Sequence, residues 1–253
     1  MDRGERARER STPCPAGTVG EPNMKGAAEK LPAGKDEVAS DRVADNFAEE
    51  NPRLSLARLG IDVLPDALSA SSRVTHITVL DLKRNSLQLL PSELFLCLTH
   101  LEEFDVSQNC LSYLPETIGV ATGLRKLNLR ANALRNLPSG FCLLHALEAL
   151  DIAQNSLETL PTAIGGWKKL RRLDVANNKL KEIPHEADSL VELEHVDISG
   201  NPVQRMPLAI ERLQTKGELL RSKARRQKLV RRALHVRGSV RAAFVDECLR
   251  EGS

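Results

Sequence analysis

The sequence predicts an α/β solenoid, a curved stack of repeats with a short parallel β-sheet on its concave face. The main observation is a seven-point pattern that recurs six times between Ile77 and Ile210: three apolar residues, an Asn, two further apolar residues and a Pro. The copies begin at residues 77, 101, 124, 147, 170 and 193. Aromatic residues make up only 3% of the chain, so small and aliphatic side chains fill the core, as suits a thin solenoid layer.

A single repeat explains why copies must stack. In the third copy, Leu127 and Leu129 alternate with polar residues, which predicts a short strand with one buried face. Asn132 follows where the chain turns, and its amide can donate to and accept from unpaired backbone groups. One such unit cannot bury its own apolar face, so strands stack in register at a spacing of about 4.8 Å. We therefore expect a buried structural ladder of Asn85, Asn109, Asn132, Asn155, Asn178 and Asn201.

The composition divides the chain into four segments. Residues 1–40 are rich in Gly, Pro, Ser, Ala and charge, which predicts a disordered segment. Residues 41–76 are expected to form an N-terminal cap and a degenerate first repeat, in which Leu59 stands where the Asn belongs. Residues 77–210 hold the six full repeats, and residues 211–253 are expected to form a basic, helical C-terminal cap or tail.

The C-terminal segment is strongly basic, although the whole chain carries a net charge of only +2. Between residues 212 and 241 there are eleven Lys and Arg residues and one Glu, a balance of +10. Three interpretations stay open: a solvated face of a capping helix, a nuclear localisation patch, or a helix that binds calmodulin, anions or a membrane surface.

The sequence holds no catalytic constellation. The six His residues fall at unrelated repeat positions, and there is neither a phosphate-binding Gly-rich loop nor a nucleophile elbow. Five cysteines without close spacing predict neither a disulfide framework nor a zinc site. Asp recurs at one repeat position, but the repeat consensus explains it better than a cation site does. We expect no enzyme activity, no cofactor and no metal.

These motifs resemble the intracellular leucine-rich repeat proteins of the 23-residue LxxLxLxxNxLxxLP type, such as Ras-group and Ras-suppressor-like scaffolds. The resemblance covers about residues 54–210 and concerns framework positions, so no partner-binding residue is carried over from the family. It implies a non-catalytic protein-interaction module, a scaffold or adaptor in signal transduction. The implied partner is a protein, for example one of a small-GTPase pathway, bound on the concave face.

The third and fifth positions of each repeat alternate with buried strand positions and should face the concave side. The row of Asp at the fifth position should repel phosphates, so nucleic acid is not the expected ligand. Lys126 and Arg172 interrupt this row and can pair with neighbouring Asp residues; they either only balance its charge or help to dock a protein of complementary charge. The predicted partner-binding residues are Glu103, Asp105, Lys126, Asn128, Arg130, Asp151, Arg172, Asp174, His195 and Asp197.

Two further functions remain alternatives: binding of an anion, a membrane surface or calmodulin through the basic tail, and service as the regulatory subunit of an enzyme. The sequence shows no signal peptide and no apolar run of about 20 residues, so we expect a cytoplasmic protein. The basic segment leaves the nucleus open as a second location. A monomer is the expected state.

Overall fold

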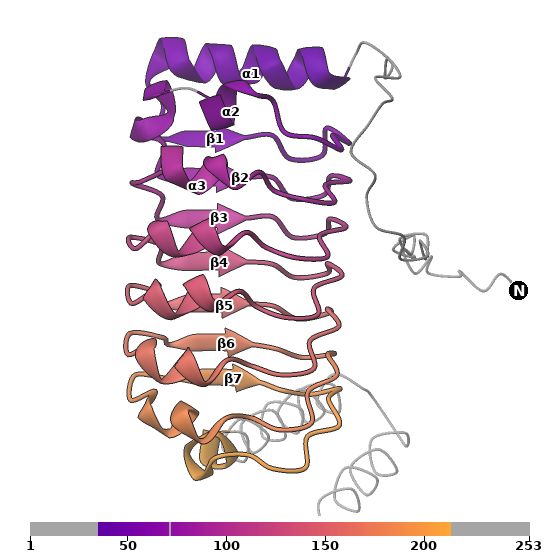
Figure 1. Ribbon diagram of the computed structural model, residues 1–253, viewed down its shortest axis with the longest axis vertical. Coiled ribbons are helices and arrows are strands. Elements are labelled where there is room, and N and C mark those ends of the chain that lie inside the picture. Colours follow the sequence, from indigo (N-terminus) through magenta and orange to yellow (C-terminus); the bar gives the residue numbers. More distant parts are fainter. Residues whose placement is uncertain (1–34, 71, 214–253) are drawn as a thin grey trace, which may run out of the picture.

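The computed structural model describes residues 35–70 and 72–213 (Figure 1). These residues form a solenoid with one seven-stranded parallel sheet, whose strands follow one another in chain order. Each repeat contributes one strand of three residues. The strands are β1 (Arg53–Ser55), β2 (Val79–Asp81), β3 (Glu103–Asp105), β4 (Lys126–Asn128), β5 (Ala149–Asp151), β6 (Arg172–Asp174) and β7 (His195–Asp197).

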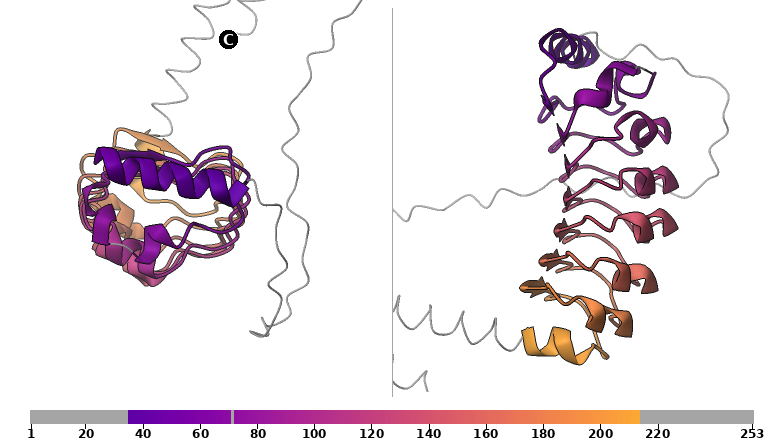
Figure 2. Two further views of the ribbon diagram at one scale, coloured as in Figure 1. Left: turned by 90° about the horizontal axis from the view of Figure 1, so that it is seen from above. Right: turned by 90° about the vertical axis from the view of Figure 1, so that its left-hand side faces the viewer.

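The return segments of the repeats are short helices on the face opposite the sheet (Figure 2). A longer helix, α1, lies across the N-terminal end of the stack (Figure 1), and residues 208–213 are helical at the other end. The elements are α1 (Lys35–Glu49), α2 (Ala67–Ala70), η1 (Ser72–His76), α3 (Glu93–Cys97), η2 (Glu116–Val120), η3 (Ser139–Leu143), η4 (Thr162–Gly166) and η5 (His185–Ser189).

The repeats stack in register, residue for residue. The central strand residues Leu80, Phe104 and Leu127 are paired neighbours on β2, β3 and β4, and all three are buried. One continuous apolar core runs from α1 to Ile210. The structure therefore confirms the predicted solenoid with its parallel sheet.

The repeat Asn side chains join successive repeats by hydrogen bonds. Asn132 Nδ2 donates to Val106 O of the preceding repeat and to Leu129 O of its own, both at 3.0 Å, while its Oδ1 accepts from Leu111 N at 3.0 Å. The other five repeat this arrangement. Asn132 and Asn201 are only partly buried, whereas the remaining members are buried.

The residue before each ladder Asn adopts a left-handed backbone conformation. In the third repeat this residue is Ala131, with φ of 55°, and in the sixth it is Gly200, with φ of 71°. This conformation turns the chain out of the strand and places the Asn side chain within hydrogen-bond distance of backbone groups of its own and the preceding repeat. Only Gly adopts this conformation without steric cost. In the other repeats, a residue with a side chain occupies the position, and the turn forms at a cost in backbone strain.

The N-terminal region differs from the prediction in its boundary. Helix α1 begins at Lys35, so residues 35–40 are not disordered as the composition suggested. Ala39 and Val43 lie on one face of α1 and are fully buried, which explains the order. Strand β1 pairs with β2 although Leu59 replaces the Asn, because Asn85 Oδ1 accepts the Leu59 N–H at 3.0 Å. The predictions for residues 1–34 and 214–253 lie outside the described residues.

Candidate functional site

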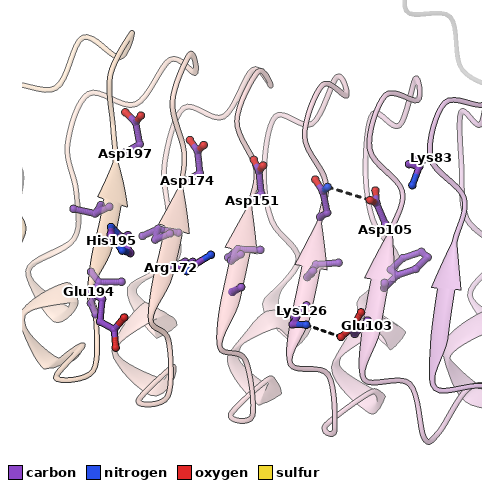
Figure 3. Close-up of a pocket in the computed structure, with 18 of the residues that line it drawn as sticks. Lys83, Glu103, Asp105, Lys126, Asp151, Arg172, Asp174, Glu194, His195 and Asp197 are labelled. Carbon is purple, nitrogen blue, oxygen red and sulfur yellow. Dashed lines mark hydrogen bonds and ion pairs between the residues drawn. The ribbon is translucent and has the colours of Figure 1, made fainter. Parts of the chain in front are cut away.

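The exposed face of the sheet forms a groove of about 1140 Å³ that runs from β2 to β7 (Figure 3). Its floor is the backbone of the strands, because central residues such as Phe104 and Leu127 bury their side chains in the core, and its walls are the two rows of side chains that alternate with them. Leu213 lines it at the C-terminal end. The charged or polar side chains of the lining are Asp81, Lys83, Glu103, Asp105, Lys126, Asn128, Asp151, Arg172, Asp174, Glu194, His195 and Asp197.

The last residue of each strand from β2 to β7 is Asp or Asn. In all six, the side-chain oxygen accepts a hydrogen bond from the backbone N–H two residues later. Asp151 Oδ1 accepts from Ala153 N at 3.0 Å, and Asp174 Oδ1 accepts from Ala176 N at 3.0 Å. Asp81, Asp105, Asn128 and Asp197 form the same bond to the residue two positions later. This bond secures the turn that leaves the strand, which is a structural reason for an Asp or Asn at this position.

Ion pairs connect neighbouring repeats along the groove. Lys126 Nζ lies 2.6 Å from Glu103 Oε1 (Figure 3), so Lys126 pairs with a Glu and not with an Asp as predicted. Arg130 Nη1 lies 3.9 Å from Asp151 Oδ2 and 3.7 Å from Asp174 Oδ2. These side chains are about one third to two thirds exposed, where a single pair contributes at most about 1 kcal/mol. Arg172 forms no ion pair with another side chain of residues 35–70 and 72–213.

The pKa of Asp151 is raised above its usual value. Burial at the end of β5 is the largest cause, and the charges of Asp174 and Asp105 raise this pKa further. The hydrogen bond from Ala153 N and the charge of Arg130 act in the opposite direction. The negative charge of Asp151 is therefore unfavourable in the folded chain.

The groove as a whole has a negative balance. Seven carboxylates and three Lys or Arg side chains line it, which leaves −4. The balance is more negative at β5 to β7, where four carboxylates, Asp151, Asp174, Glu194 and Asp197, face one cation, Arg172 (Figure 3), than at β2 to β4, which hold three carboxylates and two lysines. Such a surface favours a ligand that carries positive charge.

Nine of the ten predicted partner-binding residues line the groove. Arg130 is the exception, because it lies beside the groove and contacts it through Asp151 and Asp174. The sequence reasoning missed Lys83, Glu194 and Leu213, which lie outside the third and fifth repeat positions. Lys83 and Glu194 are polar residues next to a strand, a signal too common to single them out.

The described residues hold no arrangement that suggests metal chemistry: among residues 35–70 and 72–213, no three His, Cys, Asp or Glu are placed to bind one ion. Cys97 and Cys142 are free thiols, and Cys110 is disulfide-bonded. No helix in this part of the chain is long and apolar enough to span a membrane.

No family model matches the chain. Mouse (Mus musculus) leucine-rich repeat and IQ domain-containing protein 4 is 34% identical over 91 residues, which cover 36% of this chain and 15% of that protein. Among solved structures, YopM, a leucine-rich effector protein from Yersinia pestis, has a TM-score of 0.56 and 26% identity, and the match covers 70% of this chain and 46% of YopM.

A third similar structure is the leucine-rich repeat ectodomain of the receptor kinase GASSHO1/SCHENGEN3 from Arabidopsis thaliana, solved in complex with CASPARIAN STRIP INTEGRITY FACTOR 2. Its TM-score is 0.53 at 29% identity, and the match covers 60% of this chain and 18% of that one. The chain spans less than half the length of each of these three proteins. The repeat pattern, the seven-stranded parallel sheet and these similarities together show that the chain is a leucine-rich repeat protein.

Proposed function

We propose that the chain is an interaction module that binds a protein partner in the groove over β2 to β7, as a scaffold or adaptor in signal transduction in the cytoplasm. Leucine-rich repeats generally mediate protein–protein interaction, and they are generally not catalytic. The observation that carries the proposal is the groove itself, where two rows of mostly charged and polar side chains stand on the exposed face of the sheet. A small-GTPase pathway is one source of such a partner.

The dimensions and chemistry of the groove suit a polypeptide. Six strands at a spacing of about 4.8 Å give a surface about 24 Å long, enough for a peptide segment or one face of a small domain. Charged groups at such a surface set specificity and association rate more than they set affinity. Lys126 and Arg172 interrupt the carboxylates, so the two cations should orient the partner along the groove.

The test is partner capture with the variant Lys126→Glu with Arg172→Glu. Both side chains are exposed groove residues, so the fold should persist. A partner that these two cations orient through its own carboxylates should be lost, because the reversed charges repel those carboxylates. A matched control is Lys169→Glu with Lys181→Glu, which makes the same change of charge at two exposed residues outside the groove. Circular dichroism first establishes that both variants are folded, and quantitative mass spectrometry then compares captured partners.

Retention of every wild-type partner by the folded groove variant would refute the proposal. Two alternatives would then take its place. One is binding of an anion, a membrane surface or calmodulin through the basic segment of residues 211–253, and the other is a role as the regulatory subunit of an enzyme. The first rests on sequence composition.

A further inference from the structure

The last described residue of the chain lies in the groove. Ile210 is fully buried against the final repeat, and Leu213 packs partly buried against the core. Leu213 also lines the groove, together with His195 and Asp197 of β7. The polypeptide that follows Leu213 therefore starts from the C-terminal end of the groove, next to its most acidic part.

The sequence that starts there is basic. Residues 214–241 contain ten Lys and Arg residues and one Glu, a balance of +9, against −4 for the groove lining. The segment is also long enough to reach the whole groove. Its 28 residues would span about 42 Å even as one continuous helix, whereas five strand spacings, from β7 to β2, amount to about 24 Å.

The fold does not require the negative charges of the groove. Asn128 forms the same backbone hydrogen bond, to Arg130 N at 3.1 Å, that the five Asp residues of its row form, so a neutral amide meets the structural need. The charge is moreover unfavourable at Asp151, whose pKa is raised by burial and by the neighbouring Asp174 and Asp105. These charges therefore suit an interaction with a further cation, in addition to the ion pairs that Arg130 forms with Asp151 and Asp174.

We propose that residues 214–241 dock on the carboxylates of the groove in the same chain and so compete with the partner for this surface. The inference rests on the proposed function, since competition requires a partner in the groove. Linkage to the repeats gives the segment an effective concentration of about 1 mM or more, so even weak docking blocks the groove. A partner must displace the segment, which makes the groove autoinhibited.

The test measures how accessible the groove is to a fluorescent synthetic peptide of residues 214–241, by fluorescence anisotropy with full-length protein at low ionic strength. The tail variant carries Arg225→Gln, Arg226→Gln, Arg231→Gln and Arg232→Gln, which keep helix-forming side chains but remove four charges. It should bind the added peptide at least about tenfold more tightly than wild type does, because its own segment no longer competes. Salt should weaken the binding.

A second pair of variants locates the binding in the groove. In the tail-variant background, Asp151→Asn with Asp174→Asn should lower the affinity for the peptide at least about threefold, about half of the expected tenfold difference on a logarithmic scale. Both Asn residues keep the backbone hydrogen bond, as Asn128 does. The matched control is Glu158→Gln with Glu182→Gln, two exposed carboxylates outside the groove, and its affinity should stay unchanged.

Two results would overturn the inference. Equal affinity of wild type and tail variant would mean that the groove is not covered by its own segment, and failure of the tail variant to bind the peptide would mean that the groove does not recognise it. Neither result affects the proposed function, which the Lys126 and Arg172 variant tests separately by partner capture.

A measurement on unmodified protein guards against a misfolded variant. Carbodiimide joins an amine to a carboxylate in direct contact, so Lys216, Lys223 or Lys228 should become linked to Asp151, Asp174 or another groove carboxylate. Mass spectrometry of the digested monomer identifies the linked residues. Links from these lysines only to carboxylates outside the groove would contradict the inference.

Discussion

Asn128 Nδ2 donates a hydrogen bond to Asp105 Oδ2 at 3.2 Å, from β4 to the neighbouring strand β3 (Figure 3). Asn128 is the neutral member of a row that otherwise consists of Asp, and it forms the same bond to the backbone as they do. A neutral side chain therefore forms the backbone hydrogen bond that this position requires, and it also donates a hydrogen bond to the adjacent carboxylate. The charge of the other members can be tested apart from their structural role.

Asp151→Asn should raise the free energy of unfolding at neutral pH, because it removes a charge whose pKa the fold raises. A raised pKa means that the folded chain binds the proton more tightly than the unfolded chain, so the charged carboxylate destabilises the fold at neutral pH. This penalty vanishes as pH falls below the ordinary value of 3.8. Urea denaturation at about pH 7 and pH 3 checks it, with the exposed Asp62→Asn as control. A less stable variant at pH 7 would contradict the expectation.

Asn132→Ala should destabilise the protein by about 1–3 kcal/mol, because the backbone groups Leu111 N and Val106 O lose their hydrogen-bond partner in a partly buried part of the structure. The loss should spread to the neighbouring repeats, since their stability depends on the shared interfaces. The control is Asn136→Ala, an exposed residue of the same repeat. Equal midpoints of chemical denaturation for Asn132→Ala and wild type would refute a stabilising ladder.

Ala131→Gly should stabilise the protein by about 1 kcal/mol. Ala131 has φ of 55°, a left-handed conformation that costs residues other than Gly about 1–2 kcal/mol, partly offset by the larger entropy of Gly in the unfolded chain. The sixth repeat already has Gly200 at this position. Ala133→Gly, two residues along, serves as the control and should not stabilise. Thermal denaturation distinguishes the two, and a loss of stability in Ala131→Gly would show that the strain is absent.

Gly140→Ala should destabilise the protein by about 1–3 kcal/mol through overpacking. A Cβ atom on Gly140 would overlap the carbonyl oxygen of Glu116, where η2 and η3 pack closely. The control is Gly166→Ala, since a Cβ atom there meets its nearest neighbour, Cys142 O, only at 3.7 Å. Denaturation midpoints that fall equally in both variants would mean that the close approach is not the cause.

Glu116→Gln should destabilise the protein at neutral pH and have little effect in acid. The carboxylate accepts hydrogen bonds from Gly140 N at 2.8 Å, from Ser139 Oγ at 2.8 Å and from Ser139 N at 3.2 Å, and these bonds lower its pKa. A lowered pKa adds stability above the ordinary value of 4.5 that is lost as pH falls through the folded value. Denaturation from about pH 7 to pH 3 tests it, with Glu158→Gln as control. If Glu116→Gln were still less stable than wild type at pH 3, the cause would be altered packing and not the lost charge.

The repeat sequence by itself determined the fold, because the requirement to bury one apolar face per repeat leaves stacking as the solution. It also placed Asp105, Lys126 and Arg172 correctly on the exposed face of the sheet, since a strand alternates between two faces. Because this alternation depends only on the position of a residue within its strand, the face on which a residue lies is predictable from the repeat spacing alone.

Tertiary structure decided the features that depend on contacts between repeats. The choice of Glu103 as the partner of Lys126 follows from the register of β3 and β4 and from side-chain reach. The order of residues 35–40 follows from the burial of Ala39 against the first repeat, where composition alone suggested disorder. The position of Leu213 in the groove depends on the path of the chain beyond the last repeat, where the repeat pattern has ended and spacing no longer constrains it.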